Sequence, residues 1–111
     1  MNRMTVGGRT IELDKDGFLV ELSDWSAEVA SALAAAEDLE LTPEHWEVLE
    51  LLRSFYKEFQ LSPATRPLIK YTAMKLGPDK GNSLHLNRLF KGTPAKLAAK
   101  LAGLPKPTNC L

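Results

Sequence analysis

The sequence predicts an α+β fold: a small N-terminal β-hairpin on an orthogonal helical bundle of about five helices, followed by an extended C-terminal arm. Residues 4–13 resemble two short strands around a glycine pair, whereas apolar residues recur at helical spacing from about residue 23 onwards. The last eight residues follow a helix-stopping glycine, Gly103, and contain two prolines that keep the backbone extended. We therefore predict one domain over residues 1–103 and a flexible arm over residues 104–111.

The hairpin prediction rests on the Gly-Gly pair at 7–8, a two-residue turn signal between residues 4–6 and 9–13. A second turn at residues 14–17 predicts a third short strand over residues 18–20.

The first two helices have recognisable starts. Ser23 or Asp24 can cap a helix that runs to about Glu37. The Thr-Pro pair at 42–43 places a hydroxyl cap before a proline at the first helical position. The helix after it carries apolar residues at three-to-four spacing up to Phe59, which predicts a core-facing stripe.

Three further helices complete the bundle. The Ser-Pro pair at 62–63 starts the third, and Pro67 predicts an irregular first turn before residues 68–76 become helical. Asn82 or Ser83 caps a short fourth helix. The last helix starts at the Thr-Pro pair of residues 93–94 and ends at Gly103.

Composition limits the class of protein. With 44% hydrophobic and 25% charged residues, the 111-residue chain resembles an ordinary soluble domain. No apolar run approaches the roughly 20 residues of a membrane span, and the N-terminus lacks the apolar core of a signal peptide. A single cysteine excludes an internal disulfide and a cysteine-based metal site. We expect a cytoplasmic protein without membrane contact, cofactor or stable metal.

That cysteine, Cys110, is the next-to-last residue and the main candidate for chemistry. Eight extended residues span roughly 25 Å, so the predicted arm would present its thiol to another protein. The alternative is an incidental cysteine at a frayed terminus.

The charges are distributed unevenly. Residues 1–69 carry 6 Lys/Arg and 13 Asp/Glu, whereas residues 70–111 carry 8 Lys/Arg and one acidic residue, Asp79. Lysines 96, 100 and 106 near Cys110 would favour its thiolate and attract an anionic partner. Alternatively, the two halves attract each other within the fold.

Other candidates are weaker. His45 and His85 have no partner at metal-ligand spacing, and we predict both to be surface or half-buried side chains. A helix-turn-helix DNA-binding regulator is an alternative, with helices joined through residues 77–82 and with Arg88 and Lys91 available for phosphates.

The chain resembles a known family over almost its whole length. Residues 94–96 and 102–107, with the penultimate Cys110, are similar to the C-terminal signature of the DsrC/TusE family of sulfur-carrier proteins. Residues 41–48, residues 62–64 with Arg66, and residues 81–83 with 88–90 resemble its TusE branch. Members of the DsrC branch carry a second cysteine eleven positions earlier, where this chain has Ala99. The resemblance therefore indicates the single-cysteine, TusE-like branch.

The resemblance implies a sulfurtransferase that carries sulfur as a persulfide on Cys110. It would take sulfur from a TusBCD-like donor complex and pass it to an MnmA-like tRNA 2-thiouridylase for wobble-position thiolation. An alternative within the family is a DsrC-like sulfur-trafficking protein of dissimilatory sulfur metabolism.

Overall fold

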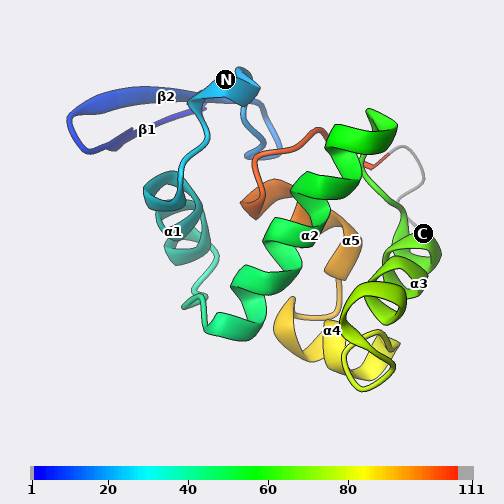
Figure 1. Cartoon of the computed structure of the whole chain (residues 1–111). Coiled ribbons are helices and arrows are strands. Elements are labelled where there is room, and N and C mark those ends of the chain that lie inside the picture. Colours follow the sequence, from blue (N-terminus) through cyan, green and yellow to red (C-terminus); the bar gives the residue numbers. More distant parts are fainter. Residues whose placement is uncertain (1, 108–111) are drawn as a thin grey trace.

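The computed structural model describes residues 2–107, so Cys110 lies outside the described residues. A two-stranded hairpin extends from a body of packed helices, as Figure 1 shows, and the predicted α+β architecture is confirmed. The elements in chain order are β1 (Asn2–Val6), β2 (Arg9–Leu13), a short 3-10 turn η1 (Leu22–Asp24), α1 (Ala27–Ala36), α2 (Pro43–Phe59), α3 (Thr65–Leu76), α4 (Ser83–Leu89) and α5 (Pro94–Leu101).

The hairpin forms at the predicted glycine pair. Gly7 and Gly8 both have positive φ, 55° and 81°, the backbone that a tight two-residue hairpin turn requires. The predicted third strand is wrong, because only one isolated bridge joins Leu13 to Leu19. Phe18 and Leu19 are both buried, so consecutive side chains do not alternate between faces as they would in a strand.

Two helix starts differ from the prediction. Helix α1 begins after Ser26, whose hydroxyl accepts from the Val29 amide at 3.1 Å, and not after Ser23 or Asp24. Helix α3 begins at Thr65 and includes Pro67 in its first turn. Amides there have no intrahelical partner, so the proline removes no hydrogen bond and the predicted irregular turn is absent.

Helix α2 starts after Thr42 as predicted, and its inner face buries Val48, Leu49 and Leu52. The core-facing stripe does not extend to the end of the helix, because the Phe59 side chain is 49% exposed.

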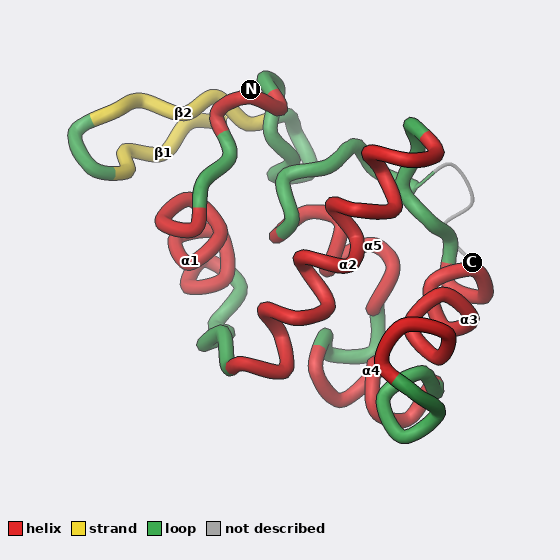
Figure 2. Tube along the Cα trace, in the orientation of Figure 1, coloured by secondary structure: helices red, strands yellow, loops and turns green. Residues whose placement is uncertain are grey.

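Helix α5 lies at the centre of the body, in contact with α1, α2, α3 and α4 (Figure 2). Ala98, Ala99 and Leu101 have no exposed surface. Small side chains on α5 let the neighbouring helices approach closely. The most buried helix of the molecule therefore leads directly into the chain that carries Cys110.

Candidate functional site

The C-terminal segment, residues 102–107, packs against the body after leaving α5. The Leu104 side chain is only 4% exposed, and its amide donates to the Ala99 carbonyl at 2.9 Å. Pro107 is also buried. We predicted a flexible arm from Leu104 onwards, but residues 104–107 are held to the body by apolar burial and hydrogen bonds. The rest of the predicted arm, residues 108–111, lies outside the described residues.

The turn into this segment depends on Gly103. Its φ is +73°, a conformation that residues with a side chain rarely adopt. A Cβ atom here would lie 2.2 Å from Cδ1 of Trp25. The indole N–H of Trp25 donates to the Leu101 carbonyl at 2.9 Å, so the ring is fixed against the glycine. Trp25 and Gly103 together set the direction in which the chain leaves α5.

Arg53 holds the same turn from α2. Its guanidinium donates to the Ala102 carbonyl at 2.7 Å and lies 3.9 Å from the centre of the Trp25 ring. Burial lowers the pKa of the Arg53 guanidinium, which nevertheless stays charged at neutral pH. The last carbonyls of a helix lack intrahelical partners. At the end of α5, the Leu101 and Ala102 carbonyls instead accept hydrogen bonds from Trp25 and Arg53, which are distant in sequence.

Two loops fix the segment further along. The Ser62 hydroxyl, in the connection between α2 and α3, donates to the Pro105 carbonyl at 2.5 Å. The Lys106 ammonium lies 2.6 Å from a carboxylate oxygen of Asp16, in the turn after β2. This hydrogen bond lowers the pKa of the exposed Asp16 carboxyl. The segment is therefore attached both to the connection between α2 and α3 and to the turn after β2.

Substituting Arg53→Gln is expected to lower the free energy of unfolding by about 1–3 kcal/mol, because the Ala102 carbonyl loses its charged donor. Urea denaturation measures the change. Lys57→Gln, one turn later on α2, is the matched control, since Lys57 has no ion pair among residues 2–107. An equal loss of stability in both variants would contradict the anchoring role of Arg53.

The basic half of the chain is partly neutralised within the fold. Three of its lysines pair with carboxylates of the acidic half: Lys80 with Glu47 at 2.5 Å, Lys100 with Glu37 at 3.0 Å, and Lys106 with Asp16 at 2.6 Å. The first of these hydrogen bonds raises the pKa of the Lys80 ammonium. These pairs support the alternative that the two halves attract each other. The effect of the lysines on the Cys110 thiolate stays a prediction.

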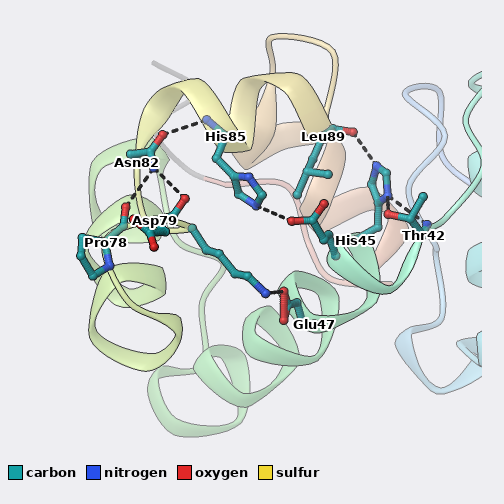
Figure 3. Close-up of polar contacts among 10 residues, drawn as sticks. Thr42, His45, Glu47, Pro78, Asp79, Asn82, His85 and Leu89 are labelled. Atoms are coloured by element: carbon teal, nitrogen blue, oxygen red, sulfur yellow. Dashed lines mark hydrogen bonds and ion pairs between the residues drawn. The ribbon is translucent and has the colours of Figure 1, made fainter.

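His45 has a structural role. The ring is 5% exposed, so it is buried and not a surface or half-buried side chain as predicted. Its Nδ1 lies 3.0 Å from the Thr42 amide, which donates to it, and its Nε2 lies 2.8 Å from the Leu89 carbonyl (Figure 3). Nδ1 must therefore be the acceptor and Nε2–H the donor, and the imidazole joins the start of α2 to the end of α4.

His85 is half-buried, as predicted, with 19% of its side chain exposed. Its Nε2 is buried, has no hydrogen bond to any of residues 2–107, and lies 3.7 Å from a carboxylate oxygen of Glu44. Figure 3 shows His85 on α4 with its ring directed toward α2. Within residues 2–107, no three His, Cys, Asp or Glu side chains come together as a metal site would require.

The helix-turn-helix alternative gains little from the structure. Residues 77–82 join α3 to α4, a longer connection than the usual 3–4 residues. Lys91, one of the two expected phosphate contacts, instead donates to the Glu37 carbonyl. Arg88 remains exposed on α4. In the described part of the chain, no helix combines the length and the apolar character needed to cross a membrane.

Several anchoring residues could not be recognised as such from the sequence. The sequence predicts Gly103 as a helix end and Ser62 as a helix start, but no local pattern links Ser62 or Trp25 to the C-terminal segment. The one usable signal was Arg53, a charged residue in the apolar stripe of α2, where a buried partner for its guanidinium is expected.

Three comparisons show which known proteins this chain is similar to. The family model described as DsrC like protein matches residues 5–111. The sulfurtransferase TusE homolog of Haemophilus influenzae is 51% identical over 97% of this chain and 99% of its own length. The sulfurtransferase TusE of Escherichia coli is 52% identical over 94% of this chain and 95% of its own.

Solved structures agree with the sequence relatives. The DsrC of Allochromatium vinosum, determined by NMR, matches with a TM-score of 0.90 and 45% identity, covering 99% of this chain and 98% of that one. The oxidized gamma-subunit of the dissimilatory sulfite reductase from Archaeoglobus fulgidus matches with a TM-score of 0.86 and 38% identity, over 99% and 100% of the two chains. The resemblance recognised in the sequence is thus confirmed, and the chain belongs to the DsrC-like family, with TusE sulfurtransferases among its relatives.

Proposed function

We propose that this protein is a sulfurtransferase that carries sulfur as a persulfide on Cys110. It takes the sulfur from a TusBCD-like donor complex and delivers it to an MnmA-like tRNA 2-thiouridylase, for thiolation of the tRNA wobble position. The observation that carries the proposal is a lone cysteine just beyond an anchored segment, in a chain 52% identical to E. coli TusE.

The chemistry needs only thiols. The Cys110 thiolate attacks the sulfane sulfur of the donor's cysteine persulfide, a new S–S bond forms, and the donor's cysteine leaves as a thiolate. In the next step the acceptor's thiolate attacks the terminal sulfur on Cys110. The Cys110 thiolate is then released. Each step moves one sulfane sulfur and consumes no external oxidant or reductant.

The proposed contribution of the body is to position the chain that carries the thiol. Fixing a backbone residue costs roughly 1–2 kcal/mol in conformational entropy. Residues 104–107 are already held by Ala99, Ser62 and Asp16 before a partner binds. Fewer residues then have to be ordered inside a partner's active site.

The absence of a second cysteine favours tRNA thiolation over the alternative in dissimilatory sulfur metabolism. Ala99 occupies the position of the second cysteine of the DsrC branch, so an internal disulfide or trisulfide cannot form. The 45% identity to A. vinosum DsrC keeps a sulfur-trafficking role as the second candidate. In either role we expect the protein to act in the cytoplasm.

A reconstituted relay tests the proposal. Wild-type protein incubated with the E. coli TusBCD complex loaded with persulfide is expected to gain one sulfur atom on Cys110, detected by intact-mass and peptide mass spectrometry. Adding the E. coli thiouridylase MnmA and unmodified tRNA should then produce 2-thiouridine. The proposal fails if no sulfur is transferred under conditions in which E. coli TusE supports the reaction.

A further inference from the structure

A groove of about 310 Å³ lies between the second half of α2 and helix α3. We call it the α2–α3 groove. It is lined by Phe55 and Phe59 of α2 and by Lys70, Tyr71, Met74 and Lys75 of α3. The hydrogen bonds and the ion pair described above for residues 102–107 do not use these side chains.

The lining of the groove is unusually apolar for an outer surface. The Phe55 ring contacts Phe59 and Tyr71, with centroids 4.6 Å and 5.0 Å apart, and these contacts fix the aromatic surface. The side chains of Phe59 and Met74 are nevertheless 49% and 71% exposed. A contiguous exposed patch of aromatic and methionine side chains is typical of a protein-binding surface.

The rim of the groove is basic. Lys70 and Lys75 are exposed, and neither has an ion pair among residues 2–107, in contrast to Lys80, Lys100 and Lys106. Helix α3 contains no acidic residue, and Glu58 of α2 is the one carboxylate that lines the groove. Lys75 lies 5.5 Å from the centre of the Tyr71 ring, and neither lysine is neutralised by a carboxylate of the described residues. Their positive charge favours a partner with carboxylates around its apolar contact.

One end of the groove, at Phe59 and Pro67, lies next to the connection between α2 and α3. The connection between α2 and α3 contains Ser62, which donates to the Pro105 carbonyl. In Figure 1 the C-terminal segment passes beside the end of α2 and this connection. A protein seated in the groove would therefore lie next to the connection whose Ser62 hydroxyl holds Pro105.

We propose that the α2–α3 groove is the docking surface for a protein that exchanges sulfur with Cys110. That partner presents an apolar side chain to Phe59 and Met74, flanked by carboxylates that pair with Lys70 and Lys75. The inference rests on the proposed function and deepens it, because it assigns partner recognition to a surface of the body separate from the reactive thiol.

Two groove variants test the inference independently: Met74→Glu, and the double substitution Lys70→Glu with Lys75→Glu. The matched controls are Leu84→Glu, an apolar residue of α4 that is 62% exposed, and Arg88→Glu on the same helix. Circular dichroism and urea denaturation establish that each variant is folded. Exposed positions tolerate such changes with small effects on stability.

Sulfur transfer is measured in three steps: loading from persulfidated TusBCD, loading from glutathione persulfide, and delivery from preloaded protein to MnmA with tRNA. The groove variants should slow at least one protein-to-protein step by about tenfold or more, the effect of disrupting a central interface contact. Loading from glutathione persulfide should stay at the wild-type rate, and the control variants should behave as wild type in all steps.

The outcomes distinguish a failure of the docking proposal from a failure of the proposed carrier function. Wild-type rates for both groove variants in both protein steps would overturn the docking surface while leaving Cys110 as the carrier. Failure of wild-type protein to load from either donor would instead overturn the proposed function. Fluorescence anisotropy with tRNA alone addresses an RNA occupant. If the groove variants lost only tRNA affinity and kept transfer from TusBCD, the protein-docking proposal would be wrong.

Discussion

Replacing Cys110 by serine is expected to abolish sulfur acceptance while leaving the fold unchanged. Cys110 is the only cysteine of the chain, so no other side chain can form a persulfide. The fold should persist because the buried core of residues 2–107 is formed by side chains between Val6 and Leu104. Serine preserves the approximate shape of the side chain but supplies no sulfur nucleophile.

Two measurements on the same preparation check this expectation. Intact-mass spectrometry after incubation with persulfidated TusBCD should show no added sulfur on Cys110→Ser, and its thermal midpoint should match that of the wild type. Asn109→Ser is the control, because it changes the neighbouring side chain and keeps the thiol. Covalently bound sulfur on Cys110→Ser would contradict the carrier mechanism.

The second large effect is expected from Gly103→Ala, which should lower the free energy of unfolding by about 2–5 kcal/mol. A left-handed backbone costs a residue with a side chain about 1–2 kcal/mol, and overpacking typically costs a further 1–3 kcal/mol. Both penalties apply because φ is +73° and the new Cβ would lie 2.2 Å from Trp25 Cδ1. The indole cannot retreat without losing its hydrogen bond to the Leu101 carbonyl.

Gly92→Ala provides a matched control. Gly92 has a similar φ of +83°, but a Cβ there has no atom within 4 Å. It should therefore show the backbone penalty alone, and urea denaturation of the two variants isolates the contact with Trp25. A double-mutant cycle with Trp25→Gly, which also removes the Trp25 Cβ that would lie 2.7 Å from the new atom, should give strongly non-additive stabilities. Equal destabilisation by the two alanine substitutions would refute the steric role of Trp25.

Local signals predicted much of the fold correctly. The glycine pair at 7–8, Thr42 before Pro43, Asn82, and the Thr-Pro pair at 93–94 each act within a few residues, and each marks an observed turn or helix start. One error arose where several signals of the same kind competed. Ser26 caps α1 in place of Ser23 or Asp24, although all three are good N-cap residues.

Only part of the candidate site could be predicted from local sequence signals. Cys110 and Gly103 could be identified by position and residue type. Trp25 contacts the end of α5 across 76 residues of sequence, and Ser62 reaches Pro105 across 43. No periodicity links positions so far apart, because tertiary packing alone brings them together.

The anchoring of residues 104–107 limits how far from the body the Cys110 thiol can reach. Measured from Pro107, three extended residues reach about 10 Å, whereas an arm starting at Leu104 would reach roughly 25 Å. The volume open to the thiol scales with the cube of this reach, so the anchors reduce it about fifteenfold. A docked partner then meets the thiol at a correspondingly higher effective concentration, provided that its own cysteine lies within the short tether. A partner that binds elsewhere on the body cannot bring its cysteine within reach of the Cys110 thiol. The short reach therefore makes sulfur exchange selective for partners that dock close to the C-terminal segment.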